Sequence, residues 1–311
     1  MPPPGRNPHP LTLKNRICLR AFAKINLGLK ILGRRPDGYH SIRTVYQSVA
    51  LHDRLDILLL RRAKGIRVEC DDPDLPSGPD NLVYRACQLW KRARGLSGGI
   101  HVRLVKRIPA GSGLGGASSD AAAALLGLER LTGERLSQHS RWKLLARLGS
   151  DVPFFLWGGR GLGVGRGEEV FPLSDLSLRS CLVVFPGFHV STPDAYREAG
   201  RELTKRRRGD RISLLGAWSP LPLESWGPAE NDFERIVFAR WPGLARLKSQ
   251  LIRAGAETAS LTGSGSALYA VFASARKLQD ACGDLPAGWK VFVTRSLSRA
   301  AYQRRRVVSV H

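Results

Sequence analysis

The sequence predicts a protein of mixed helices and strands in two domains, and three observations support this expectation. An alternating strand pattern at 100–104 leads into a glycine-rich loop and then an alanine-rich helix pattern from Asp120. The length of 311 residues allows one large or two ordinary domains, each with its own core. Six glycines between Gly158 and Gly167 precede a change in composition near Ser174, where we place a domain boundary. The expected segments are a proline-rich disordered tail at 1–15 and domains at 16–173 and 174–311.

Before the glycine-rich loop, strands and one helix are expected. Ordered structure begins near Arg16, and the apolar runs within 45–60 are typical of strands. The stretch 33–40 between them has the Gly, Pro and Asp content of a turn. A helix follows through Trp90, for which Asp80 or Asn81 is a suitable N-cap.

After the loop, the chain alternates between the two kinds of element. We expect a helix at 137–148 closed by Gly149, a strand at 182–185, a solvated basic surface loop at 201–228, a helical region at 231–254, and a last strand at 290–294 before a basic tail.

The loop at 109–119 is the most informative stretch of the chain. Its glycines let bare backbone N–H groups approach a ligand, and the helix behind it adds the positive end of its dipole. Both features favour phosphate. The spacing Gly111-x-Gly113-x-x-Gly116 also fits the dinucleotide-binding pattern, but no second strand with an acidic end follows. A tight turn without a ligand is the alternative. The predicted phosphate-binding residues are Pro109, Ala110, Gly111, Ser112, Gly113, Leu114, Gly115, Gly116, Ala117, Ser118 and Ser119.

The net charge of +23 is extreme and favours a polyanionic partner. Nucleic acid and a nucleotide or diphosphate substrate are both candidates, and a merely basic surface is the third possibility. The five cysteines show no CxxC spacing, which favours a reducing cytosol over a zinc site or a disulfide framework. No apolar run reaches 18 residues, and the first residues lack the apolar segment of a signal peptide.

Several polar residues elsewhere allow a structural and a functional interpretation. Lys24 and Asn26 share one face of an expected strand, where spacing alone favours an ordinary exposed lysine. Tyr39 and His40 give a turn a stacking face and a hydrogen-bonding edge, or they simply pack against the protein. Asp151 suits the N-cap of a helix that has Pro153 in its first turn, and spacing alone favours that role.

Three stretches resemble motifs of the GHMP small-molecule kinases, the family of galactokinase, homoserine kinase and mevalonate kinase. They are Ala-Lys-Ile-Asn-Leu at 23–27, the loop at 109–119, and the glycine-serine loop and strand at 259–272. The segment Gly-Arg-Arg-Pro-Asp-Gly-Tyr-His at 33–40 resembles the members that phosphorylate a cytidine diphosphate alcohol. The resemblance extends from about Leu19 to Thr294.

This resemblance implies a fold and a reaction. The expected fold is α+β in two domains, an N-terminal ATP-binding and catalytic domain with a left-handed βαβ unit and a C-terminal ferredoxin-like domain. The left-handedness of the βαβ unit is implied by the resemblance alone, because nothing in the sequence reveals the hand of the crossover. The implied reaction is ATP-dependent phosphorylation of the tertiary 2-hydroxyl of a cytidine diphosphate ester of 2-C-methyl-D-erythritol, in the non-mevalonate isoprenoid pathway.

The resemblance also assigns roles to residues. Asp151, in Gly-x-Asp-Val-Pro-Phe-Phe, is the expected catalytic base and Lys24 its partner, which reverses the interpretations from spacing. Asn81 and Lys106 are expected near ATP, although capping explains Asn81 equally well. Magnesium is expected with the nucleotide, with Ser118 or Ser119 as the nearest protein oxygens and no carboxylate ligand identified. The expected substrate-binding residues are Asn26, Tyr39, His40, Tyr196, Gly263 and Ser264, with Tyr39 and Tyr196 on either side of the cytosine.

Two other functions remain open from the sequence. Another GHMP kinase, for homoserine, mevalonate or a sugar, would keep the phosphate loop without needing Tyr39, His40 and Tyr196. A basic RNA-binding protein would explain the charge, but it predicts interleaved aromatic and basic residues rather than a glycine-serine loop. We expect a cytoplasmic enzyme, monomeric or weakly dimeric, with no nucleic acid or membrane partner.

Overall fold

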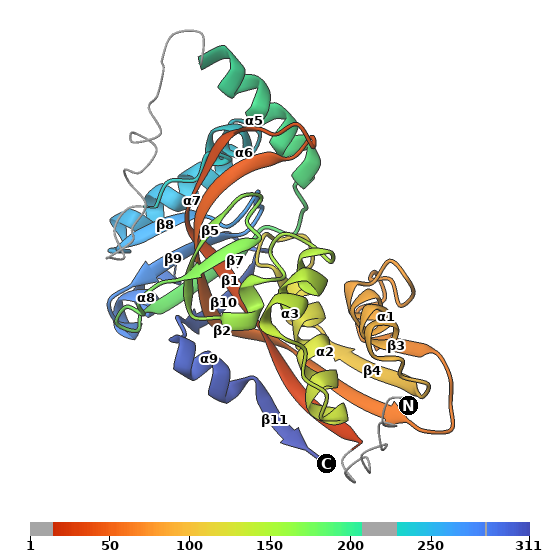
Figure 1. Ribbon diagram of the computed structural model, residues 1–311. Coiled ribbons are helices and arrows are strands. Elements are labelled where there is room, and N and C mark those ends of the chain that lie inside the picture. Colours follow the sequence, from red (N-terminus) through yellow and green to blue (C-terminus); the bar gives the residue numbers. More distant parts are fainter. Residues whose placement is uncertain (1–14, 207–228, 284) are drawn as a thin grey trace.

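The computed structural model describes residues 15–206, 229–283 and 285–311, which form two sheets covered by helices (Figure 1). All of the expected tail except Asn15 lies outside these residues, as does 207–228 of the expected basic loop. The part of that loop at 201–206 is helical rather than irregular, because it continues a helix that begins before it.

The first sheet is built on a long antiparallel pair, β1 (Arg16–Arg34) and β2 (His40–Leu60). Its central order is β11-β1-β2-β4-β3, and β5 joins β2 on one side and β6 on the other. The pair β3–β4 is parallel, so α1 between them completes a βαβ unit. The other elements of this half are β3 (Ile66–Cys70), β4 (Gly99–Val105), β5 (Arg160–Val164), β6 (Glu169–Pro172), α1 (Leu82–Arg94), α2 (Gly116–Thr132), α3 (Gln138–Ala146) and α4 (Phe154–Trp157).

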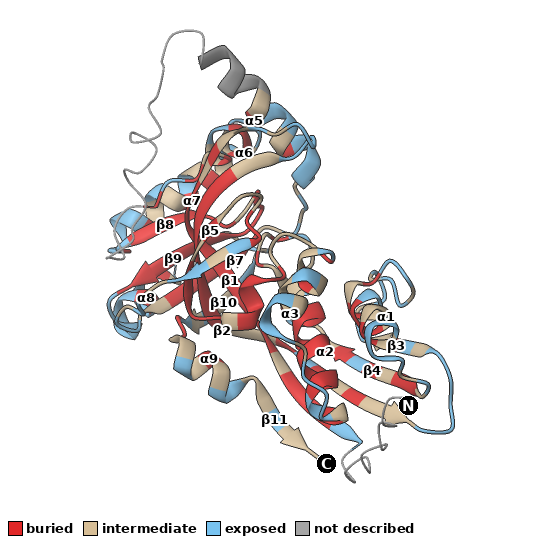
Figure 2. Cartoon of the chain, in the orientation of Figure 1, coloured by how far each residue is buried: buried red, intermediate tan, exposed pale blue. Residues whose placement is uncertain are grey.

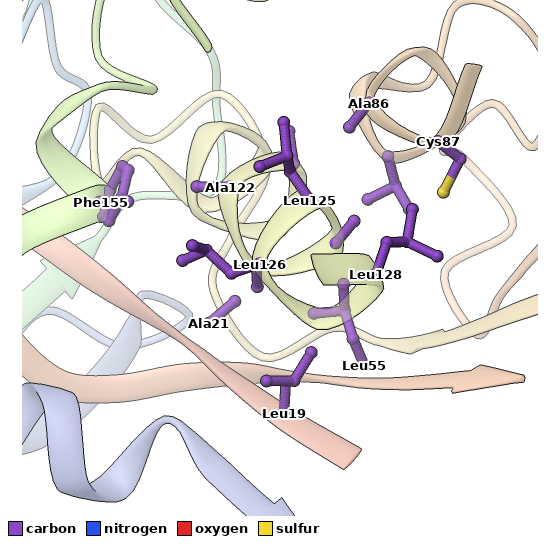
Figure 3. Close-up of a cluster of buried hydrophobic side chains, with 14 of the residues drawn as sticks. Leu19, Ala21, Leu55, Ala86, Cys87, Ala122, Leu125, Leu126, Leu128 and Phe155 are labelled. Carbon is purple, nitrogen blue, oxygen red and sulfur yellow. The ribbon is translucent and has the colours of Figure 1, made fainter. Parts of the chain in front are cut away.

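Helix α2 is the centre of the first core. Its alanines and leucines pack between the sheet and the neighbouring helices, and almost the whole helix is buried (Figures 2 and 3). Small side chains allow this close packing, since a Cβ on Gly127 would stand 2.6 Å from Leu19 Cδ1. Helix α2, which follows the glycine-rich loop at 109–119, is therefore held rigidly by its surroundings.

The second sheet has the order β10-β7-β9-β8 and is antiparallel throughout. With helices between its first and second strands and between its third and fourth, this is the ferredoxin-like arrangement. Its elements are β7 (Ser180–Phe185), α5 (Thr192–Arg206), α6 (Glu234–Arg240), α7 (Pro242–Arg253), β8 (Thr258–Leu261), β9 (Leu268–Phe272), α8 (Ala275–Ala281) and β10 (Lys290–Arg295). The expected α+β fold is confirmed.

The two halves are joined by more than one connection. The far end of the β1–β2 hairpin packs Leu29, Ile31 and Ile42 into the core of the second half. The residues after β10, expected as a tail, instead form α9 (Arg299–Arg305) and β11 (Val307–Val310), and β11 pairs with β1. The chain changes sheets between β6 and β7, and a boundary near Ser174 stays a proposal.

Candidate active site

A cavity of about 1170 Å³ is lined by both halves of the molecule. It is bordered by β1 and β2, the loop before α2, the segment before α4, helix α5 and the loop between β8 and β9. Such a volume is typical of sites for larger ligands. Of the residues predicted to bind or react, all but Leu114 and Ser119 line it. Those that line it are Lys24, Asn26, Tyr39, His40, Asn81, Lys106, Pro109, Ala110, Gly111, Ser112, Gly113, Gly115, Gly116, Ala117, Ser118, Asp151, Tyr196, Gly263 and Ser264.

Lys24 and Asp151 form an ion pair in the cavity wall. Lys24 Nζ lies 3.2 Å from Asp151 Oδ2, and the lysine side chain is 2% exposed while the aspartate is 32% exposed. The Tyr46 hydroxyl donates to Asp151 Oδ1 at 2.9 Å. Asp151 is not the N-cap that its spacing favoured, because α4 begins only at Phe154 and its N-cap position is Pro153. The carboxylate is turned to the lysine instead.

The Asn26 side chain connects the first and third motifs. Its oxygen accepts from Lys24 Nζ at 2.7 Å and from the Gly263 N–H at 2.7 Å. Its amide donates to Thr44 Oγ1 at 2.8 Å. Asn26 thus borders the cavity, and its contacts hold Lys24 against the third motif.

The loop before α2 keeps its backbone open to the cavity. Gly113 has φ +81°, and a Cβ there would stand 2.0 Å from the Thr262 carbonyl oxygen, so only glycine allows the second and third motifs to meet. Gly115, with φ +73°, is the N-cap of α2, and as a glycine it has no side chain to cap that helix. The first N–H groups of α2 therefore remain available to an anion.

Lys106 lies under this loop in a buried cluster of charges. Its ammonium is 2.8 Å from Asp120 Oδ2 and also pairs with Asp53 Oδ2. Asp53 Oδ1 accepts from the N–H groups of Arg107 and Ile108. Burial alone would lower the pKa of Lys106, but Asp120 and Asp53 raise it above its ordinary value. Burial, with Asp53 nearby, raises the pKa of Asp120 to about 8. Lys106 borders the cavity, but its charge is already paired.

Asn81 caps a helix at the same end of the cavity. Its side chain accepts from the Val83 N–H at 2.8 Å and donates to the Pro76 carbonyl at 2.7 Å. The capping role that the sequence allowed is therefore present. Its place in the cavity wall leaves contact with a nucleotide as a proposal.

Aromatic residues gather at the other end of the cavity. The His40 ring stacks on Tyr196 with centroids 5.3 Å apart and planes at 17°, and Tyr196 meets Phe233 edge-on at 4.8 Å. Tyr39 is 55% exposed, and the Arg166 guanidinium lies 4.8 Å from its ring centroid. Both tyrosines line the cavity, and a base held between them stays a prediction.

The described residues contain no group of three or more His, Cys, Asp or Glu side chains placed to hold a metal ion. The serines at the start of α2 nevertheless suit a nucleotide-bound cation. Ser118 lines the cavity, and the buried Ser119 Oγ has no hydrogen-bond partner within the described part of the chain. Hydroxyl oxygens are the hard ligands that magnesium accepts beside phosphate oxygens.

Two residues of the site escaped the sequence reasoning. Tyr46 is a fully buried strand residue whose phenol pKa is raised far above its ordinary value by burial and by Asp151. Arg166 lies in the glycine-rich hairpin, oriented by Glu168 Oε1 at 3.1 Å. Neither belongs to a motif named above. Side chains alternate between the two faces of a strand, so Tyr46, six residues after His40 in β2, lies on the same face as His40. This shared face is the sequence feature that could have indicated Tyr46.

Comparison with known proteins agrees with the fold and the site. Residues 81–159 match the GHMP kinases N terminal domain and residues 222–290 match the GHMP kinases C terminal domain. A homoserine kinase from Cytophaga hutchinsonii, at 21% identity, shares the fold with a TM-score of 0.69 over 94% of this chain and 98% of its own. Fold and site together define a small-molecule kinase, a class of enzyme that uses ATP.

More similar relatives narrow the class. The 4-diphosphocytidyl-2-C-methyl-D-erythritol kinase of Solibacter usitatus is 46% identical over 257 residues, covering 82% of this chain and 80% of the relative. That of Prosthecochloris aestuarii is 38% identical over 286 residues, covering 89% and 96%. A crystal structure of 4-(cytidine 5'-diphospho)-2C-methyl-D-erythritol kinase matches with a TM-score of 0.71 at 32% identity, over 90% of this chain and 99% of that one. The chain belongs to the 4-diphosphocytidyl-2-C-methyl-D-erythritol kinase family.

No helix among the described residues has the length and apolar character needed to span a membrane.

Proposed function

We propose that this protein transfers the terminal phosphoryl group of ATP to the 2-hydroxyl of 4-diphosphocytidyl-2-C-methyl-D-erythritol. The products are the 2-phosphate and ADP, and the reaction belongs to the non-mevalonate isoprenoid precursor pathway. The observation that carries the proposal is the Lys24–Asp151 pair in one cavity wall, with the open loop before α2 and the Tyr196–His40 stack lining the same cavity.

Asp151 accepts the proton of the attacking hydroxyl. Its carboxylate is half-buried in the cavity wall, where a positioned base contributes about 10²–10⁴-fold to the rate. Lys24 pairs with this carboxylate and stabilises negative charge on the transferring group. Asn26 fixes Lys24 from one side, and Tyr46 fixes Asp151 from another.

The loop before α2 binds the phosphates of ATP. Phosphoryl transfer depends mainly on positioning and charge stabilisation, which backbone N–H groups and a helix N-terminus supply. Ser118, which lines the cavity, or Ser119 beside it would hold the magnesium that accompanies the nucleotide, and the bound ion would supply positive charge against the phosphates. Asn81 and Lys106 lie at the same end of the cavity and complete the nucleotide end.

The aromatic end of the cavity binds the cytidine. Tyr39 and Tyr196 supply ring faces, and base stacking on an aromatic side chain is worth about 1–3 kcal/mol. His40 supplies a ring edge for the pyrimidine. Arg166 lies over Tyr39 in the same cavity wall and supplies a positive charge for the diphosphate of the substrate.

We further propose a cytoplasmic enzyme, monomeric or weakly dimeric, that needs no nucleic acid. The five cysteines have no CxxC spacing, and this pattern favours a reducing compartment. Its polyanionic partners are then its two substrates.

The decisive experiment compares acceptors. ADP release is measured with 4-diphosphocytidyl-2-C-methyl-D-erythritol, homoserine, mevalonate and galactose at equal concentrations. The proposal expects turnover with the cytidine substrate alone. Turnover with another acceptor and not with this one would assign the chain to a sibling kinase. Binding to RNA on a filter in moderate salt, without any ADP release, would favour the RNA-binding alternative.

A further inference from the structure

Helix α5 holds the His40 ring from two directions. Tyr196 and Gly200 are four residues apart, so they lie on the same face of α5, which Figure 1 shows beside the far end of the β1–β2 hairpin. Tyr196 stacks on the face of the imidazole at 5.3 Å between centroids. Gly200 meets its edge, because a Cβ built there would stand 2.6 Å from His40 Nε2.

Because the His40 ring packs against α5, one edge of the imidazole is buried against the helix while another part of the ring faces the cavity. His40 Nε2 is buried and has no hydrogen-bond partner within the described part of the chain. The ring also lines the cavity, so part of it remains open to a ligand. Burial, followed by the charge of Arg34, lowers the pKa of His40, which favours a neutral ring. A neutral imidazole can either donate to or accept from the edge of a base.

We propose that Gly200 is a positioning residue for the cytidine site. Its missing side chain lets His40 sit deep against α5, in register with Tyr196, and this depth sets where the imidazole edge meets the pyrimidine. The inference rests on the proposed function and deepens it, because the substrate class is taken from there. No ligand contact is assigned to Gly200 itself.

The cost of any side chain at Gly200 follows from the distances. Ordinary contact of a Cβ begins near 3.4 Å, so an alanine would push the ring by about 1 Å, a shift that can cost a reaction up to about 10²-fold. The ring has α5 behind it and Tyr196 over its face, so it moves toward the cavity. This displacement of the His40 ring would narrow the cytidine end of the cavity. It would also move the imidazole edge away from the position in which it meets the pyrimidine.

An ordinary helical glycine would behave in the opposite way. Gly200 does not have a positive φ, so alanine is not strained there and should favour the helix. Gly243 in α7 offers a matched control, because the nearest atoms to a Cβ at that position are 4.0 Å away. Gly243→Ala therefore reports the effect of a glycine-to-alanine change in a helix without a collision.

The test is a double-mutant cycle on the full-length protein. KM for 4-diphosphocytidyl-2-C-methyl-D-erythritol, KM for ATP and Tm are measured for the wild type, Gly200→Ala, Gly243→Ala, His40→Ala and the Gly200→Ala/His40→Ala double variant. We expect Gly200→Ala to raise the KM for the cytidine substrate by about tenfold or more, with KM for ATP unchanged. In the His40→Ala background, Gly200→Ala should change that KM less than about twofold, because the ring it collides with is gone.

The possible results separate cleanly. A Gly200→Ala variant that behaves like Gly243→Ala overturns the inference, and so does an equal rise in KM in the presence and absence of His40. If Gly200→Ala lowers Tm, the inference is supported when adding His40→Ala in the double variant removes that loss. It is overturned when the loss of Tm persists in the double variant. A wild type that does not turn over the cytidine substrate contradicts the proposed function instead, so the two failures are distinguishable.

Discussion

Two buried lysines flank the phosphate loop, and their surroundings differ in one respect. Lys24 is 2% exposed and pairs with a single carboxylate, Asp151, that is 32% exposed toward the cavity. Lys106 has a side chain 7% exposed and lies between two carboxylates that are 0% and 2% exposed. The first lysine leaves its carboxylate accessible to a ligand. The second is enclosed with both of its partners.

The comparison shows that closeness to the phosphate loop does not define a reactive group. A buried pair can take part in chemistry only if one member still faces the cavity, as Asp151 does. A buried cluster whose charges all face one another mainly joins elements, here β2, α2 and the segment that follows β4. Removing one member of such a cluster leaves an uncompensated buried charge. The two sites should therefore respond to substitution in different ways.

The largest effect is expected from Asp151→Asn. This change keeps the shape of the side chain and removes the base, so kcat should fall about 10²–10⁴-fold. Tm should fall as well, because the buried Lys24 loses the carboxylate with which it pairs. Initial rates of ADP release and a thermal melt measure the two quantities. Near wild-type kcat in a folded variant would remove Asp151 from the role of base.

Replacing each lysine by methionine tests the comparison directly. Lys106→Met leaves the buried Asp53 carboxylate without its cation and should lower the free energy of unfolding by about 3–5 kcal/mol. Lys24→Met should lower kcat by about 10²–10³-fold and cost less stability, because the half-exposed Asp151 can be solvated. Urea unfolding and steady-state kinetics on both variants give the result. Equal losses of stability would mean that the two lysines do the same work.

A smaller effect is expected from Asp120→Asn, and it depends on pH. The pKa of Asp120 is raised to about 8, above the ordinary value of about 3.9. A raised pKa contributes stability at low pH that is lost as pH rises between these two values. Relative to Asp120→Asn, the wild type should therefore lose stability as pH rises through this window. Urea unfolding at pH 5, 6, 7 and 8 measures the difference, and a constant difference would contradict the expectation.

The smallest change is Tyr46→Phe, which removes one hydrogen bond to Asp151. A hydrogen bond to a charged group is worth about 1.5–3 kcal/mol, so kcat should fall by about 10- to 150-fold if the reaction depends on the whole of this bond. Steady-state kinetics and a thermal melt measure the effect. A folded variant with the wild-type kcat would show that Tyr46 acts only through packing.

The sequence predicts the parts of the site that the backbone builds. The loop at 109–119, the helix behind it and the first strand follow from glycine spacing and apolar pattern. The pairing of Lys24 with Asp151 came only from the family resemblance, because spacing favoured an exposed lysine and a capping aspartate. Local pattern cannot show that a side chain 127 positions away neutralises a buried charge.

Contacts made by single side chains across the fold were not predictable. Lys106 pairs with Asp53, which lies 53 positions before it, and His40 meets α5 from the start of β2. Tyr46 lies in a strand among other buried residues and differs from them only by its hydroxyl. Such contacts depend on how the two sheets are arranged relative to each other, and this arrangement cannot be predicted from local sequence periodicity.

The pairing of β11 with β1 brings the two ends of the described chain together. The backbone N–H of Arg16 donates to the His311 carbonyl at 2.9 Å, and the N–H of His311 donates to the Arg16 carbonyl at 2.8 Å. The polypeptide therefore leaves the first sheet after β6 and comes back to it at the end. The second half is therefore connected to the first sheet at both of its ends, through the link between β6 and β7 and through β11. Removal of β11 would take away one of the connections between the second half and the first sheet.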